Sequence, residues 1–178
     1  MSGARGLAAV LMLALLSAGC GYALAGRGSS LPSYIRVIGV PLFKNATPVF
    51  DLDRTITERV RTELIGRGKY RVEPHAAGVD AVLEATITSV QLVPTANDSN
   101  GLASRYTITI TASVSFKDLK SGKEIWANPG LSFRDEYPIT TATRATDVSA
   151  FFGQDTSAVA RLAADFARTV VSAMLEAF

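Results

Sequence analysis

A strictly alternating segment, residues 105–116, constrains the fold of this 178-residue chain more than any other feature of its sequence. Successive side chains of a β-strand point to opposite faces of the sheet, so alternation predicts a strand with one buried and one polar face. The chain must therefore form a sheet that other elements cover on one side. The apolar set is Tyr106, Ile108, Ile110, Ala112, Val114 and Phe116, and the intervening set is Arg105, Thr107, Thr109, Thr111, Ser113 and Ser115.

Two earlier segments also predict strands. Residues 34–43 are apolar on both faces apart from Arg36, which is typical of a strand near the centre of a sheet. Proline has no amide hydrogen to donate, so Pro41 should lie near the end of this strand or at an edge pairing. Residues 69–73 predict a short second strand.

A long strand is expected over residues 80–93. Its apolar spacing changes phase near Ser89, which predicts a β-bulge, and Pro94 should end the strand. Residues 94–104 are rich in Asn, Ser and Gly and should form a loop. Residues 123–133, which hold the only tryptophan, should form a hairpin with the alternating strand.

The segment after Pro48 predicts an amphipathic helix. Its apolar residues recur every four positions, Asp51 and Asp53 are candidate N-caps, and Gly66 and Gly68 should stop it. Two charged pairs, Arg54 with Glu58 and Arg59 with Glu63, have the i,i+4 spacing of helix ion pairs. The apolar stripe consists of Leu52, Ile56, Val60 and Leu64.

A second helix is expected at the C-terminus, beginning near Asp147 or Asp155 after an irregular segment, residues 135–146. The order of strand, helix, strands and helix predicts an α+β fold, a two-layer sandwich with two helices packed on one face of a mainly antiparallel sheet of about four strands. The helical stripe consists of Val159, Leu162, Phe166, Val170, Met174 and Phe178.

The N-terminus has the pattern of a lipoprotein export signal. Residues 1–19 contain Arg5, an apolar run of about ten residues that is too short to cross a bilayer, and three small residues before Cys20. Because Cys20 is the only cysteine, it cannot form an internal disulfide, and lipidation with palmitate-type chains explains it better than a buried free thiol. We expect cleavage before Cys20, a lipidated flexible tether over residues 20–33, and a single domain over residues 34–178.

Charge and motif content exclude several function classes. The formal net charge is only +2, and Arg5 leaves with the signal, so no basic field exists to attract nucleic acid. His75 is the only histidine, and no metalloprotease, nucleophile-elbow, CxxC or phosphate-loop motif occurs. We therefore expect no enzyme activity, no catalytic residue, no metal and no cofactor.

Several strings resemble the LPS-assembly lipoprotein family LptE, and together they cover nearly the whole expected mature chain. The strings are GCGYAL, IRVIGVPLFKN, TITERVRTELIGRGKYRV, DAVLEATITSV, RYTITITASVSFKD and SAVARLAADFARTVVSAML. The resemblance implies a two-helix, four-strand domain that inserts into the outer-membrane barrel LptD and helps deliver lipopolysaccharide to the outer leaflet. By resemblance to sorted lipoproteins of Gram-negative bacteria, Gly21 after the lipidated cysteine favours the outer membrane, with the domain on the periplasmic side.

Two sets of candidate site residues follow from this function. The hydroxyl row at Thr107, Thr109 and Thr111 suits contact with the polar wall of a barrel, although it suits a plain solvent-facing surface equally well. Lipopolysaccharide carries phosphates, which need cations, and a meander of strands should bring three arginines to one end of the sheet, although each also fits an ordinary solvated charge. These arginines are Arg105, Arg134 and Arg144.

One alternative function stays open. The string VIGVPLFKNAT also resembles the first strand of other periplasmic lipoproteins, including TolB-like and CsgG-like domains. That resemblance implies an adaptor that activates or assembles another envelope machine by binding protein, without a lipid ligand.

Overall fold

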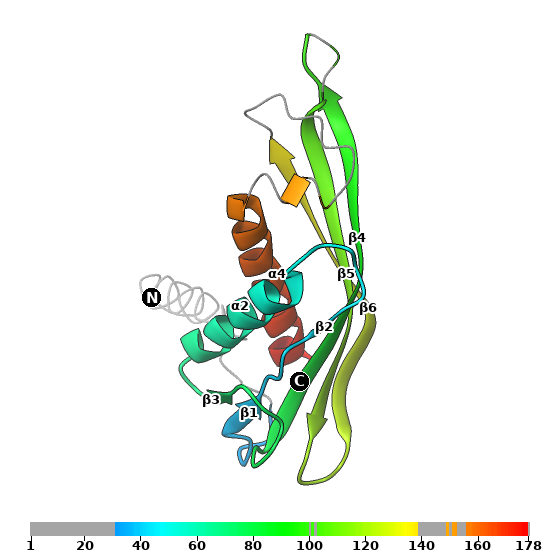
Figure 1. The fold of residues 1–178 in the computed structure, drawn as a ribbon. Coiled ribbons are helices and arrows are strands. Elements are labelled where there is room, and N and C mark those ends of the chain that lie inside the picture. Colours follow the sequence, from blue (N-terminus) through cyan, green and yellow to red (C-terminus); the bar gives the residue numbers. More distant parts are fainter. Residues whose placement is uncertain are drawn as a thin grey trace, which may run out of the picture.

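The computed structural model describes residues 31–99, 101, 103–138, 149, 151–152 and 156–177. Two helices lie on one side of a long, twisted sheet, and the other side of the sheet carries no helix in the described part of the chain (Figure 1). The architecture is therefore α+β with two layers. In the labels of Figure 1 the elements are β1 (Val37–Gly39), β2 (Lys44–Asn45), α2 (Leu52–Gly66), β3 (Arg71–Glu73), β4 (Ala81–Asn97), β5 (Ala103–Asp118), β6 (Glu124–Pro138) and α4 (Thr156–Glu176).

The sheet is mixed and has six strands, so the expectation of about four mainly antiparallel strands is only partly correct. Its order is β3-β1-β4-β5-β6, with β2 beside β4. β1 pairs in parallel with both β3 and β4, and β2 pairs in parallel with β4, whereas β4, β5 and β6 are antiparallel neighbours. The parallel part arises because α2 carries the chain back across the sheet between β1 and β3, and such a crossover brings strands together in parallel.

Residues 34–43 do not form the single strand that their pattern predicts. The strand divides into β1 and β2 on either side of Pro41. Beyond Pro41 the amide of Phe43 donates to the hydroxyl of Thr57 on α2 at 3.0 Å, so a helix side chain replaces a strand partner. Two short strands therefore take the place of one long strand.

The antiparallel strands are longer than expected, and two predicted boundaries are wrong. β4 passes through Pro94 and pairs as far as Asn97, while β6 continues to Pro138 instead of ending at residue 133. β1 and β2 pair with β4 only as far as Ile87, so the later part of β4 is an edge of the described sheet, where proline is tolerated. The register shift between Ile87 and Ser89 confirms the predicted bulge.

The core lies between the sheet and the two helices. The predicted four-residue stripe of α2 is confirmed, because all four of its members are buried, and Leu162, Phe166, Val170 and Met174 of α4 are buried as well. α4 begins at Thr156, next to the later of the two expected starts. Phe178, the last residue of the expected stripe, lies outside the described residues.

The N-cap position of α2 is predicted correctly at Asp51, but the side-chain contacts and ion pairs of this helix are not. Asp51 occupies the N-cap position with φ 60° and without a side-chain cap hydrogen bond, and its carboxylate instead pairs with Arg54 at 3.3 Å. Asp53 lies inside the first turn. The ion pairs in this helix have different partners from those expected. Arg61 donates from its Nε to the carbonyl of Val40 at 2.9 Å, and this contact holds its side chain beside Glu58. The observed pairs are Arg61 with Glu58 at 2.6 Å and Arg67 with Glu63 at 3.0 Å.

Candidate functional site

The two faces of β5 separate as the alternating sequence predicts. The even-numbered residues from Tyr106 to Phe116 are buried under the helices, and the odd-numbered residues from Thr107 to Ser115 are partly exposed on the other face. We call this second side of β4, β5 and β6 the open face.

Hydroxyl and amide side chains extend across three strands of the open face. Residues directly opposite each other in neighbouring strands share a face. Thr109 lies between Gln91 of β4 and Arg134 of β6, and Thr111 lies between Ser89 and Ser132. The row found in the sequence of β5 is therefore the middle of a wider band, whose uncharged members are Thr86, Ser89, Gln91, Thr107, Thr109, Thr111, Ser113, Ser115 and Ser132.

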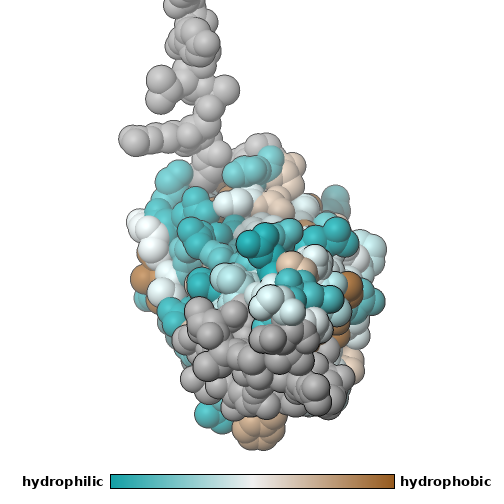
Figure 2. Space-filling view, turned by 90° about the horizontal axis from the view of Figure 1, so that it is seen from above, coloured by the Kyte–Doolittle hydropathy of each residue, from teal (hydrophilic) through white to brown (hydrophobic). Residues whose placement is uncertain are grey.

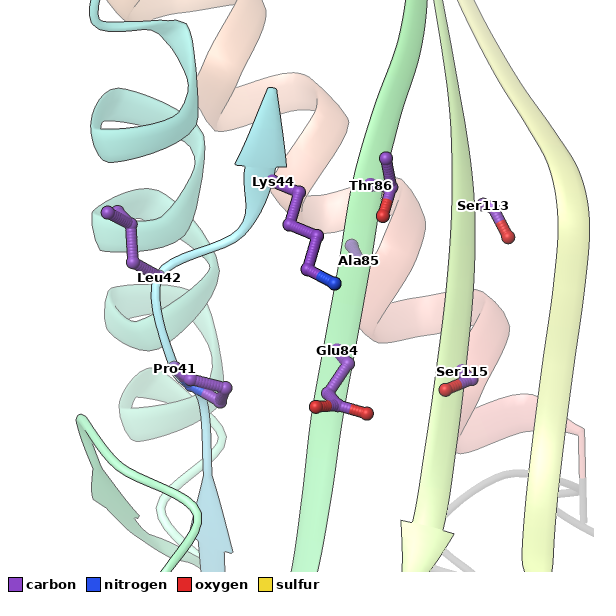
Figure 3. Close-up of a pocket in the computed structure, with 8 residues that line it drawn as sticks. All are labelled: Pro41, Leu42, Lys44, Glu84, Ala85, Thr86, Ser113 and Ser115. Carbon is purple, nitrogen blue, oxygen red and sulfur yellow. The ribbon is translucent and has the colours of Figure 1, made fainter. Parts of the chain in front are cut away.

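A shallow pocket of about 360 Å³ lies at one end of this band, where β2 approaches β4 (Figure 3). The side chain of Lys44 reaches across from β2 toward β4, and its amino group lies near Thr86 and Glu84 (Figure 3). Glu84 pairs with Lys117 at 3.5 Å, whereas Lys44 has no carboxylate within 4.0 Å among the residues that the structure describes. The pocket is lined by Pro41, Leu42, Lys44, Glu84, Ala85, Thr86, Ser113 and Ser115.

The chemistry of the pocket is that of recognition. Hydroxyls donate and accept hydrogen bonds, the ammonium donates, and the carboxylate accepts. Lys44 is a member of this site that sequence reasoning missed. No local pattern marks it, because it reaches the band only through the parallel pairing of β2 with Thr86 and Ile87 of β4.

Two of the three predicted arginines lie on the open face, but they do not meet there. Arg134 is opposite Thr109, whereas Arg105 is opposite Pro138, so four residues of strand, roughly 13 Å, separate them along β6. Arg105 pairs with Glu136 at 3.4 Å, and Glu136 lies along β6 between Arg134 and Pro138, the residue opposite Arg105. Arg144 lies outside the described residues.

The predicted partner-facing residues Thr107, Thr109 and Thr111 lie together on the open face, each partly exposed. Charges border the band at both of its ends. Lys117 and Glu84 form a pair near the hairpin between β5 and β6, and Arg105 and Glu136 form a pair near the other end. Around Thr107, Thr109 and Thr111 the charged neighbours are Glu136, opposite Thr107, and Arg134, opposite Thr109.

The strongest electrostatic perturbation of the described chain lies at the hairpin end of the sheet. Asp118 accepts hydrogen bonds from the hydroxyl of Ser121 at 2.6 Å, from the hydroxyl of Tyr34, and from the amide of Lys120 at 2.8 Å. These donors, Ser121 first, lower the pKa of Asp118 to about 2 although burial opposes the shift. The Asp118 hydrogen bond is also the main cause of a raised pKa at Tyr34.

Asp80 holds the beginning of β1 in a similar way. Its carboxylate accepts hydrogen bonds from the amides of Arg36 at 2.9 Å and Val37 at 2.8 Å, which lower the pKa of Asp80. Both carboxylates fasten the first described residues to the sheet, so their role here is structural.

His75 lies in an exposed loop with its Nδ1 at 3.0 Å from the carbonyl oxygen of Ala77. Within the described ranges, no group of three or more His, Cys, Asp or Glu residues is arranged to hold a metal ion. The same residues contain no helix with the length and apolar character needed to cross a membrane.

Comparison with solved structures relates the fold to bacterial lipoproteins. Rare lipoprotein B from Shewanella oneidensis is 17% identical with a TM-score of 0.48, and the match covers 80% of this chain and 96% of that one. Uncharacterized lipoprotein B from Nitrosomonas europaea is 8% identical with a TM-score of 0.50, covering 79% and 83%. The second match supports the fold alone.

A search among curated proteins found no match. The family model of LptE, described as lipopolysaccharide-assembly, matches residues 35–174. That range contains every strand of the sheet and α2, and it reaches almost to the end of α4. A match of this extent shows that the chain belongs to the LptE family of lipopolysaccharide-assembly proteins.

Proposed function

We propose that the open face docks against the inner wall of an LptD-like outer-membrane β-barrel, and that the chain thereby assists lipopolysaccharide transport to the cell surface. Membership of the LptE family makes the chain a non-enzymatic lipopolysaccharide-assembly lipoprotein of the bacterial envelope. The barrel partner and the use of the open face are the steps proposed beyond that membership.

The observation that carries the proposal is the hydroxyl-rich band, in which uncharged polar side chains outnumber charged ones. The interior wall of a membrane barrel is polar and presents both donors and acceptors, and a hydroxyl can bond to either. A face crowded with charges would have to lose their hydration on entering such a lumen, which is unfavourable unless each charge finds a partner. Thr107, Thr109 and Thr111 lie at the centre of the band, so they should contact the wall.

Co-purification from detergent-solubilised outer membrane tests this docking. Thr109→Glu places a carboxylate in the middle of the band and should reduce recovery of the barrel at least fivefold. Thr62→Glu is the matched control, because Thr62 is an exposed threonine on α2 and its replacement should leave recovery unchanged. Equal recovery with both variants would contradict docking through the open face.

The same pull-down separates the barrel partner from the adaptor alternative. A large outer-membrane barrel in stoichiometric amount would support the proposal. A peptidoglycan synthase or a secretion pore in its place would support an adaptor of the TolB-like or CsgG-like kind.

The anchoring part of the proposal assigns residues 1–19 to a cleaved signal, Cys20 to acylation, and residues 20–33 to the tether of a domain on the periplasmic side of the outer membrane. Two acyl chains bind a membrane stably where one does not. Cys20→Ala should therefore abolish labelling by a palmitate analogue and release the protein into the soluble fraction. Label that persists on this variant would contradict the assignment.

The ligand part of the proposal assigns lipopolysaccharide phosphates to Arg105, Arg134 and Arg144. Arg134 should matter more than Arg105, because Glu136 already neutralises Arg105 and no carboxylate lies within 4.0 Å of Arg134 in the described chain. Arg134→Glu should weaken lipopolysaccharide binding by the purified protein several-fold, and more at low salt than at high salt. Arg67→Glu, at the far end of α2, is the control, and equal binding by both variants would rule out Arg134.

A further inference from the structure

The first described residues are fastened to the end of the sheet where β5 turns into β6. Leu31 and Ile35 are buried, and the hydroxyl of Tyr34 donates a hydrogen bond to Asp118 at the end of β5. Figure 1 shows the start of β1 at the same end of the molecule as the turn between β5 and β6. Chain that precedes Leu31 must therefore leave the domain from this end.

Backbone hydrogen bonds hold the turn between β5 and β6 in place. The amide of Leu119 donates to the carbonyl of Asp80 at 3.0 Å, and the amide of Gly122 donates to the carbonyl of Asp118 at 2.9 Å. Gly122 has φ 71°, a conformation that glycine adopts readily. The side chains of the turn are thus presented on a defined backbone.

Those side chains combine exposed apolar groups with cations. Leu119 is 44% exposed at the turn, and Tyr34 beside it is 39% exposed. The ammonium of Lys120 lies 4.9 Å from the centroid of the Tyr34 ring. We call the group Tyr34, Lys117, Leu119, Lys120 and Lys123 the hairpin-end surface.

Two of the four acidic groups nearby direct their oxygens at donors within the protein, and a third forms an ion pair. Asp118 is 3% exposed and holds three hydrogen bonds, and Asp80 is occupied by two backbone amides. Lys117 is paired with Glu84, and Glu124 is the exposed carboxylate that follows the turn. Across residues 31–99 and the other described ranges, Lys120 and Lys123 have no carboxylate within 4.0 Å.

We propose that the hairpin-end surface rests on the phospholipid bilayer that holds the lipid of Cys20, with Leu119 and Tyr34 at the headgroup level and Lys120 and Lys123 beside anionic headgroups. The inference rests on the proposed acylation of Cys20. Ten residues lie between Cys20 and Leu31, and the eleven Cα–Cα steps between these two residues span at most about 40 Å when the chain is fully extended. The anchor therefore keeps Leu31, and with it the hairpin end of the sheet, within about 40 Å of the membrane.

The chemistry of the surface matches this location. Exposed apolar and aromatic groups gain from burial at a membrane interface, and basic residues next to a lipid anchor add attraction to anionic lipids. The opposite end of the molecule, seen from above in Figure 2, is mostly hydrophilic over its described residues, with only scattered hydrophobic ones.

A fluorescence experiment on the full-length acylated protein tests the contact. Because Cys20 is the only natural cysteine and is consumed by acylation, Leu119→Cys supplies a single free thiol for an environment-sensitive dye. Ser99→Cys, exposed near the turn between β4 and β5, is the matched control. In vesicles of phosphatidylethanolamine and phosphatidylglycerol at 3:1, brominated lipids should quench the dye at position 119 at least threefold more than the dye at position 99.

A charge variant and a flotation assay complete the test. Lys120→Glu with Lys123→Glu should lower the quenching at position 119 at least twofold, while the protein still floats with the vesicles. Equal quenching at positions 119 and 99 in protein that floats would overturn the contact and leave the anchor intact. Protein that does not float, and whose mass lacks acyl chains, would overturn the anchor and the contact together.

Discussion

Neighbouring residues of β5 experience opposite environments. Phe116 is buried against the helical layer, while Ser115, one position earlier, is partly exposed on the open face and lines the pocket beside Lys44. Full burial of a large apolar side chain stabilises a fold by roughly 1.5–3 kcal/mol, whereas exposed substitutions usually change stability by less than about 0.5 kcal/mol. The comparison teaches that the two faces of one strand can have different roles: the covered face contributes stability, and the open face is available for recognition.

The largest effect on stability should come from the helical side of the covered face. Phe166 of α4 is fully buried and meets Phe133 of β6 edge to face, with ring centroids 6.4 Å apart. Phe166→Ala should lower the free energy of unfolding by about 3–5 kcal/mol, because it leaves a cavity that the sheet cannot fill. Urea denaturation measures the change, and a loss below about 1 kcal/mol would show that the two layers are loosely packed.

The buried hydroxyl of Thr57, on the inner side of α2, should have the next largest effect on the free energy of unfolding. Thr57 accepts a hydrogen bond from the amide of Phe43 at 3.0 Å and donates one to the carbonyl of Asp53 at 2.6 Å. Thr57→Val keeps the shape but leaves the Phe43 amide without its acceptor, so it should cost about 1–3 kcal/mol. Thr62→Val, at an exposed site of the same helix, is the control and should change the free energy of unfolding by less than about 0.5 kcal/mol.

Asp118 continues the buried row of β5 as a carboxylate, and it should make stability depend on acid pH. Its pKa in the folded protein is about 2, below the ordinary value near 3.9, so the folded state favours the charged form. The stability it provides is therefore complete above pH ~4 and is lost as the pH falls toward 2. The difference in urea denaturation midpoint between the unaltered protein and the Asp118→Asn variant should shrink over that pH interval. A difference that stays constant would contradict this role of Asp118.

The smallest effect on stability should come from the centre of the open face. Thr109→Val keeps a β-branched side chain and should change the free energy of unfolding by less than about 0.5 kcal/mol. If the face meets a polar wall, the same substitution should still weaken recovery of the barrel partner, because it removes a group that both donates and accepts. A loss of stability above about 1 kcal/mol would contradict the inference that the open face contributes little to stability.

Much of the secondary structure could be predicted from the sequence because it depends on local periodicity. Alternation in residues 105–116 identified both faces of β5, and the four-residue spacing from Leu52 to Leu64 identified the buried stripe of α2. The phase change near Ser89 identified the bulge of β4. Short strings together with this order also identified the LptE family.

Pairing and partners were decided only by the tertiary structure, because they depend on residues far apart in the chain. Nothing local indicates that β4 continues through Pro94, since the strand is held there by β5. Asp51 occupies the predicted N-cap position, but its side chain does not cap the helix because its backbone has φ 60° instead of the extended conformation of a capping residue. Asp118 could not be recognised as buried before Tyr34, 84 positions away in the chain, was placed beside it. The position of Lys44 beside the open face also depends on distant residues. It is set by the parallel register of β2 on β4, and not by the residues next to Lys44 in sequence.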